Sequence, residues 1–168
     1  MATKDELIGG LQMVIQEGKR IGEAFGDEQW TTVQDFDGWK NREVLAHVAS
    51  IGGIVVPFVT AMANAPAGAD ASTGMDVDTL NAQLVGQRAG KSAGELVGEI
   101  ETSYGQVIEW VRSADDATLK QRATFGGYKD LPLSDMLVRL VVLHGLAHIY
   151  SAYAATLGLP TGAAKATA

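Results

Sequence analysis

Two of the three histidines in this chain lie four residues apart, at His144 and His148. They fall in the apolar stretch of residues 141–150, which otherwise reads as the interior of a helix. Side chains at positions i and i+4 lie on one helical face, one turn apart. Two imidazoles placed in this way can bind one metal ion, as in other helical His-x-x-x-His sites. The question that follows is whether His47 reaches the same point.

The hydrophobic pattern predicts that His47 does so. Apolar residues recur at helical spacing in four long segments, which are residues 5–25, 40–64, 92–113 and 133–157. His47 lies on the apolar stripe of the second segment, and His144 and His148 lie on that of the fourth. Every histidine of the chain is therefore expected to point into the core, from two helices that can face each other.

Four amphipathic helices, with a longer crossover between the second and the third, predict an all-α four-helix bundle. The crossover is expected to contain a short helix at residues 77–87. Residues 115–131 are expected to be irregular, with a turn at Gly126-Gly127, and no alternating pattern of useful length predicts a strand. We expect one domain over residues 1–160 and a flexible tail over residues 161–168.

Two helix starts carry capping signals. Ser92 followed by Glu95 is a capping box, which predicts that the third long helix begins just after Ser92. Asp37 or Asn41 could cap the second long helix, and Glu43 would place a negative charge in its first turn.

Composition excludes several classes of function. The chain has 168 residues, 46% of them apolar, and a formal charge of −7, which argues against nucleic acid and anionic membranes as partners. It contains no cysteine, so any metal must be held by nitrogen and oxygen, and any thiol must come from another molecule. The longest apolar run, residues 51–62, is too short to span a membrane, and we expect a cytoplasmic protein.

The three histidines together favour a metal site made of His47, His144 and His148. Burying an imidazole without a partner costs about 1–3 kcal/mol, whereas one shared divalent ion would satisfy all three. The alternative is a metal-free core in which the histidines pack and form hydrogen bonds. Three neutral ligands leave an open coordination position, which is typical of catalytic sites. We expect zinc, with nickel, iron and manganese as alternatives.

Two motifs resemble the DinB/YfiT-like superfamily of four-helix-bundle metalloproteins. Residues 38–47 (GWKNREVLAH) are similar to that family's tryptophan-led entry into the second helix, which ends in the first metal ligand. His144-x-x-x-His148 is similar to the second and third ligands. Residues 78–95, with Asn81 and Arg88, are also similar to the subset related to mycothiol-dependent maleylpyruvate isomerase. In that isomerase a glutamate corresponds to His144.

This resemblance implies a metal-binding bundle that is often dimeric and acts as a thiol S-transferase, an isomerase or a metal-dependent hydrolase. We therefore expect an enzyme in which a divalent ion activates a low-molecular-weight thiol or water toward a small-molecule substrate. The alternative is a non-enzymatic protein that binds a metal or a small ligand, for instance in stress or sequestration. A homodimer is expected from the resemblance alone.

Five further residues could take part, each with a simpler interpretation. Glu43 could act as a base but also suits a helix start, and Tyr104 is a core tyrosine. Arg88 could bind a carboxylate. Trp39 suits a packing anchor, and Ser151 has a hydroxyl without an activating partner. We expect packing or solvation to account for most of them.

Overall fold

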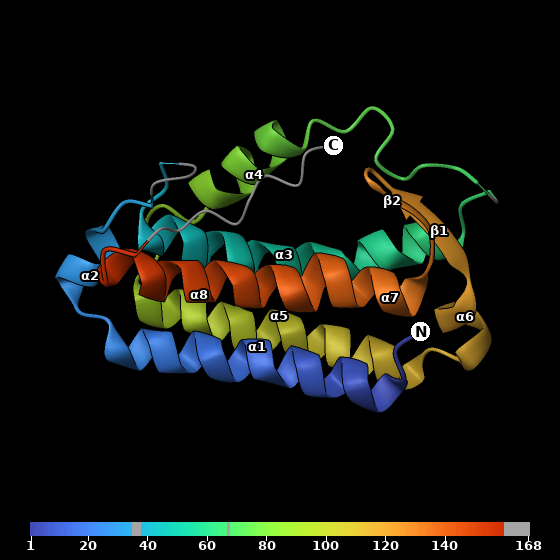
Figure 1. Ribbon diagram of the computed structural model, residues 1–168, viewed down its shortest axis with the longest axis horizontal. Coiled ribbons are helices and arrows are strands. Elements are labelled where there is room, and N and C mark those ends of the chain that lie inside the picture. Colours follow the sequence, from blue (N-terminus) through green and yellow to red (C-terminus); the bar gives the residue numbers. More distant parts are fainter. Residues whose placement is uncertain (35–37, 67, 160–168) are drawn as a thin grey trace.

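The computed structural model describes residues 1–34, 38–66 and 68–159 (Figure 1). The elements follow in the order α1 (Lys4–Ala24), α2 (Asp27–Thr31), α3 (Asn41–Ala63), α4 (Val77–Gly86), α5 (Ala93–Ser113), α6 (Asp116–Lys120), β1 (Arg122–Phe125), β2 (Tyr128–Pro132), α7 (Leu133–Leu137), the π-helical segment η1 (Val138–Leu143) and α8 (His144–Thr156). The tail expected at residues 161–168 lies outside the described residues, as does Asp37.

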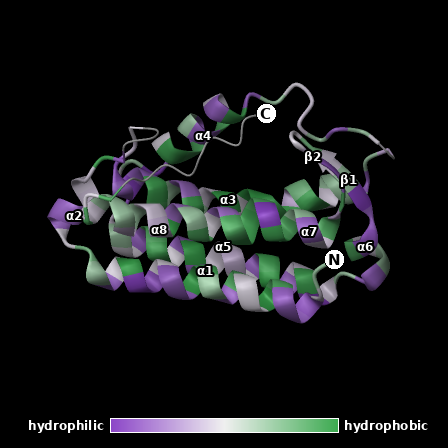
Figure 2. Cartoon of the chain, viewed as in Figure 1, coloured by the Kyte–Doolittle hydropathy of each residue, from purple (hydrophilic) through white to green (hydrophobic). Residues whose placement is uncertain are grey.

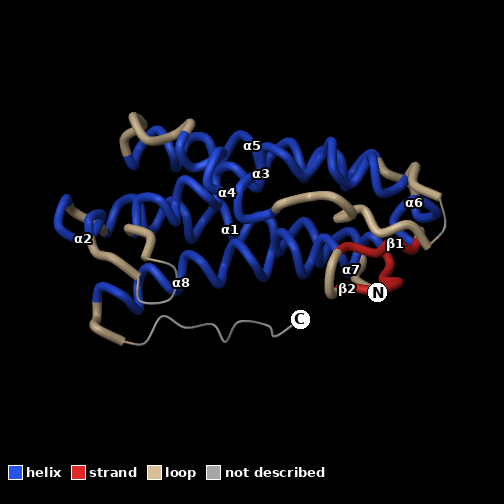
Figure 3. Tube along the Cα trace, turned by 90° about the horizontal axis from the view of Figure 1, so that it is seen from above, coloured by secondary structure: helices blue, strands red, loops and turns tan. Residues whose placement is uncertain are grey.

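The long helices form the expected all-α four-helix bundle. The fourth member is the continuous helix made of α7, η1 and α8 (Figures 1 and 3). Both α1 and α3 pack against α5 and against α8. The helix that carries His47 is therefore a direct neighbour of the helix that carries His144 and His148. The crossover from α3 to α5 carries α4, which lies along α3 on the outside of the bundle.

The core is built from the apolar stripes that the sequence predicted. On α5 the whole stripe is buried, namely Leu96, Ile100, Tyr104, Val107 and Val111. Figure 2 shows hydrophobic and hydrophilic residues alternating along the bundle helices, as expected for helices with one buried face. Burial of these stripes, at about 25 cal/mol per Å² of apolar surface, is the main force that holds the helices together.

The two predicted helix starts had different outcomes. At α5 the capping box is confirmed, because the Glu95 carboxylate accepts from the Ser92 N–H at 2.7 Å and Ser92 Oγ accepts from the Glu95 N–H at 3.3 Å. Asn41 does not cap α3. It lies fully buried in the first turn, where its amide donates to the carbonyls of Gln29 and Ala152. The Glu43 carboxylate instead accepts from the Lys40 N–H at 2.8 Å.

The expectation of an irregular stretch at residues 115–131 was wrong. This stretch contains α6 and most of an antiparallel hairpin, whose turn at Gly126-Gly127 has Gly126 at a φ of 54°. Its two short strands pair with a register shift between Ala123 and Phe125, so no regular alternation marks them in the sequence. The Phe125 ring packs edge-on against Phe58 of α3 at 4.9 Å. The hairpin therefore closes the bundle end opposite α2 (Figures 1 and 3).

The last helix also departs from the sequence expectation. It is helical from Leu133 to Thr156, but residues 138–143 form a wider π-helical segment instead of α-helix. Such segments are rare and occur often at functional sites. This one ends at the residue before His144, so it sets the direction in which the two histidines of α8 project.

Two of the bundle helices are long and apolar enough to cross a membrane by length and composition. They are α3 and the helix from Leu133 to Thr156. Both are packed in the bundle core, and core helices commonly meet the same criteria. This feature is weak evidence for a membrane, so the expectation that the protein has no membrane partner stays a prediction.

The contact between α3 and α5 is close at Gly52. A Cβ atom at this position would lie 2.3 Å from Ser103 Oγ and 2.6 Å from the Tyr104 ring. The neighbouring Gly53 is exposed and has nothing within 4 Å of its Cβ position. Glycine at residue 52 is therefore required for the approach of the two helices, whereas glycine at residue 53 is not.

We predict that Gly52→Ala lowers the free energy of unfolding by about 1–3 kcal/mol, because the added methyl group forces the helices apart. Gly53→Ala is the matched control and should be neutral or raise that free energy by about 0.5–1 kcal/mol, since alanine favours helix. Urea denaturation followed by circular dichroism measures both. Equal effects of the two substitutions would contradict the close contact.

Candidate metal centre

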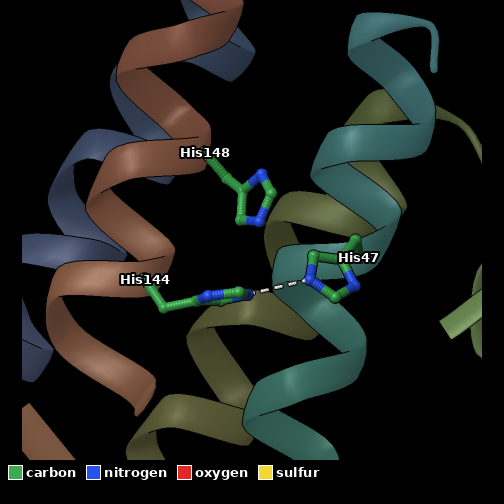
Figure 4. A group of neighbouring side chains, drawn as sticks. All are labelled: His47, His144 and His148. Atoms are coloured by element: carbon green, nitrogen blue, oxygen red, sulfur yellow. Dashed lines mark hydrogen bonds between the residues drawn. The ribbon is translucent and has the colours of Figure 1, made fainter. Parts of the chain in front are cut away.

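The structure brings all three histidines together. His47 projects from the second turn of α3, and His144 and His148 project from the first two turns of α8 (Figure 4). The Nε2 atoms of His47 and His144 are 3.0 Å apart. The ring centroids are separated by 4.5 to 5.2 Å, and one ligand atom from each residue lies within 4.8 Å of the others. Among the described residues, this group could hold a metal ion.

The distances fit ligation by nitrogen. Two nitrogens bound to one tetrahedral ion at roughly 2.0 Å lie about 3.3 Å apart. The 3.0 Å pair is close to that separation, and small rotations of the His148 ring would bring its nitrogen into the same range. The donor set of three imidazoles suits zinc and its first-row neighbours better than magnesium or calcium, which prefer oxygen.

Hydrogen bonds within the group leave polar atoms without partners. His47 is 2% exposed, and its Nδ1 atom has no hydrogen-bond partner among the described residues. The 3.0 Å contact allows one hydrogen bond between His47 and His144. A shared ion bound by the facing Nε2 atoms would replace that hydrogen bond, and Nδ1 of His47 has no described partner in either state. The case for an ion rests on the convergence of the three rings.

The environment keeps the imidazoles neutral. Burial, followed by the proximity of His148 and His144, lowers the pKa of His47 to about 3. Burial and the proximity of His144 lower the pKa of His148 to about 3, and burial also lowers that of His144. At pH 7 all three rings are uncharged, and a neutral ring nitrogen is the form that binds a metal.

A cavity of about 420 Å³ opens beside the histidines. His47 and His144 form part of its wall, and Asn81 of α4 is the other polar residue there. The remaining wall is apolar and comes from α3, the crossover with α4, β1, α7 and η1: Ile51, Ile54, Val55, Pro57, Phe58, Val59, Met62, Met75, Val77, Leu80, Phe125, Met136, Leu137, Leu140 and Val141. The group thus has access to a space large enough for a small molecule.

The further candidates from the sequence have structural roles. Trp39 packs its ring against that of His47, with centroids 5.2 Å apart. Glu43 holds the start of α3, as described above. Tyr104 is completely buried, burial raises its pKa, and its hydroxyl has no hydrogen-bond partner among the described residues. Neither Glu43 nor Tyr104 lines the cavity beside the histidines.

Arg88 and Ser151 are engaged elsewhere. The Arg88 guanidinium binds the Glu99 carboxylate through Nε at 2.8 Å and through Nη2 at 2.5 Å. Ser151 Oγ lies 2.9 Å from Gln34 Oε1 and 2.7 Å from the carbonyl of His148. These contacts leave the arginine paired with a carboxylate and give the serine no activating base.

Sequence reasoning missed a polar network that ties the two histidine helices together. Gln34, which is 1% exposed, donates to Asn41 Oδ1 at 3.1 Å and contacts Ser151 through its Oε1 atom. Asn41 also donates to the carbonyl of Ala152 in α8. One signal was available, because Asn41 lies three residues before Val44 on the buried stripe of α3. A polar residue there needs buried partners.

We predict that the metal-free protein loses stability as the pH falls below 6.5. His47 and His148 have a pKa of about 3 in the folded state and 6.5 as the ordinary value, so the unfolded chain binds more protons between those limits. Each contributes a loss of up to about 1.4 kcal/mol per pH unit. Urea denaturation at pH 7.5, 6.5 and 5.5 after chelation measures this slope, above the range in which carboxyl groups titrate.

His148→Gln is the matched variant, since it keeps a polar side chain but cannot take up a proton. Its slope between pH 6.5 and 5.5 should be smaller than that of the parent chain. A stability that stays constant from pH 7.5 to 5.5 would mean that the histidines are not buried in the neutral form.

Comparison with known proteins agrees with this architecture. The family model of the mycothiol maleylpyruvate isomerase N-terminal domain matches residues 11–148, a span that contains all three histidines. Among curated proteins, none matches the chain. A solved structure, YfiT from Bacillus subtilis, matches with a TM-score of 0.63 and 19% identity over 93% of this chain and 88% of that one. It is described as a probable metal-dependent hydrolase with an unusual four-helix bundle topology. The chain belongs to the family of the mycothiol maleylpyruvate isomerase N-terminal domain, within the DinB/YfiT-like superfamily.

Proposed function

We propose that this protein is a metal-dependent enzyme in which His47, His144 and His148 hold one divalent ion. The observation that carries the proposal is the convergence of three neutral imidazoles beside a cavity, of which His47 is buried and His144 and His148 are half-buried. Zinc is the ion that we propose first, and nickel, iron and manganese are the alternatives. YfiT, the structural relative described above as a probable metal-dependent hydrolase, supports the same class of chemistry.

The residues of the chain would prepare the site in three ways. The low pKa of His47 and of His148 keeps each ring neutral, so that one of its two nitrogens carries a free lone pair. The ring of Trp39 packs against His47 and limits its rotation. The apolar walls of the cavity exclude water from the reacting groups. When bound, a divalent ion supplies Lewis acidity that polarises a substrate carbonyl and lowers the pKa of a water or a thiol.

The proposed reaction is transfer, isomerisation or hydrolysis of a small molecule, with a thiol or water as the group that is activated. A thiol would have to be a separate low-molecular-weight compound, because the chain has no cysteine. The family name, which refers to a mycothiol-dependent isomerase, supports the thiol route. The relative YfiT supports the water route. A cytoplasmic location and a homodimer are further parts of this proposal.

We predict that untagged protein purified without added metal contains close to one equivalent of a divalent ion. His47→Ala, His144→Ala and His148→Ala should each lower this content by about tenfold or more, because two ligands bind far more weakly than three. Metal analysis by plasma mass spectrometry measures the content. Adding the ion at 100 times its dissociation constant should raise the free energy of unfolding by about 2.7 kcal/mol.

Tyr150→Ala is the control for these substitutions, since Tyr150 follows His148 on α8, is 51% exposed and is not a proposed ligand. It should keep the full metal content. A content below about a tenth of an equivalent in the parent chain, with no thermal stabilisation on adding zinc, nickel, iron or manganese, would overturn the metal site.

The enzymatic part of the proposal has a separate test. The metal-loaded protein should turn over either neutral nitrophenyl esters or an electrophilic aryl halide in the presence of an added thiol, and His144→Ala should abolish that turnover. A protein that holds one ion firmly but converts neither type of substrate would favour the alternative function, which is non-enzymatic binding of a metal or a small ligand.

A further inference from the structure

The wall of the cavity beside the histidines is almost entirely apolar. Apart from His47, His144 and Asn81, every side chain that lines it is a hydrocarbon or a thioether. Among the residues that the structure describes, no lysine, arginine, aspartate or glutamate lines this cavity. A substrate group that enters this space therefore meets dispersion contacts and the hydrophobic effect, not a counterion.

The uncharged wall disfavours substrates with charged groups away from the histidines. A carboxylate or an ammonium group moved from water into such a space loses its hydration and costs several kcal/mol, unless it is paired. The metal ion could pair with one charged group next to the histidines, but a second charge farther along the wall would stay unpaired. A dicarboxylate is thus a poor fit, whereas an uncharged molecule loses little on entry.

The chain does place cations around a different cavity. That second space, of about 950 Å³, lies beside the start of α3 and is lined by the cationic residues Lys40, Arg42 and Arg88 and by the acidic residues Asp27 and Glu43. The fold thus places charged side chains around one cavity beside α3 and apolar side chains around the other.

The mouth of the first cavity is also apolar. Met75 and Val77, at the beginning of α4, are 37% and 41% exposed and belong to its wall. Leu80 and Asn81 follow one turn later on the same helix. Exposed apolar side chains at the rim of a cavity mark an entry for an apolar ligand. The amide of Asn81 offers one donor and one acceptor to a carbonyl or hydroxyl group of that ligand.

We propose that the substrate that enters this cavity is an uncharged molecule with an aliphatic or aryl group. That group lies between α3, α4 and η1, and its single polar function, such as an ester, thioester or ketone, lies toward His47 and His144. The reaction at that function rests on the proposed metal-dependent activity, but the selection of an apolar, uncharged group does not. It follows from the wall alone and can be measured by binding.

The binding test uses two fluorescent probes that share one aromatic framework. N-phenyl-1-naphthylamine is neutral, and 8-anilino-1-naphthalenesulfonate differs from it by one sulfonate. We expect the neutral probe to bind the protein, as purified, at one site and at least ten times more tightly than the sulfonate. The titrations are done in 0.5 M salt, which shortens the screening length to about 4 Å and so suppresses repulsion by the net negative charge.

Leu80→Asp locates the site, and Leu84→Asp is its matched control. Both leucines lie on α4 and are half-buried, but Leu84 does not line the cavity. Leu80→Asp should weaken binding of the neutral probe at least tenfold, and Leu84→Asp should leave it within twofold, with far-ultraviolet circular dichroism confirming that both variants are folded. Equal affinity for the two probes, no binding of the neutral probe, or equal effects of the two substitutions would overturn the inference.

An activity measurement separates this inference from the proposed function. The metal-loaded protein is given nitrophenyl hexanoate and the nitrophenyl monoester of adipic acid, in which a carboxylate replaces the terminal methyl group of the same six-carbon chain. We expect kcat/KM to be at least tenfold higher for the hexanoate. If the neutral probe binds as expected but neither ester is converted, the hydrolytic function fails and the apolar selectivity stands. If both esters are converted equally, the selectivity fails and the function stands.

Discussion

The structure depends on the convergence of three imidazoles in an apolar surrounding, with His47 buried and His144 and His148 half-buried. A histidine in such a place must be neutral, because the charged form would lose its hydration without a partner. Burial and mutual proximity accordingly lower the pKa of His47 and of His148 to about 3. In the neutral state each ring has one nitrogen with a free lone pair, and these nitrogens can be directed at one point. The packing of the three rings, their neutral state and their capacity to hold a metal therefore all follow from one arrangement of the helices.

This arrangement places demands on the helices that carry it. The bundle makes α3 and α8 direct neighbours, and the network of Gln34, Asn41 and Ser151 joins them near the start of α3. The π-helical segment η1 ends just before His144 and changes the direction of the side chains that follow. Gly52 lets α5 approach α3 closely from the other side. These features act on the histidines through the positions of the two helices.

Much of this was predictable from the sequence, because the relevant signals are local and periodic. The four apolar stripes, the Ser92–Glu95 capping box and the inward positions of the histidines all follow from helical spacing. The hairpin at residues 122–132 could not be predicted in this way, since its strands are short and its register is broken at Ala123. Nor could the segment η1, because a π-helical turn leaves the apolar pattern of Leu140, Val141 and Val142 unchanged. Asn41 was interpreted as a possible helix cap, because the carbonyls of Gln29 and Ala152 that it binds are distant in the sequence.

The distribution of charge around α3 indicates how the fold separates two environments. The cavity beside His47 and His144 has an apolar wall, and the space beside Lys40 and Arg42 has a wall with charged residues of both signs. Trp39 links them, since its ring contacts His47 and also lines the charged space. A polar molecule could thus approach α3 through the charged space, and an apolar molecule could approach it through the apolar cavity. The histidines of α3 and α8 lie where these two environments meet, so they can serve a reaction between a polar and an apolar molecule. The ring of Trp39 helps to keep water away from the histidine group.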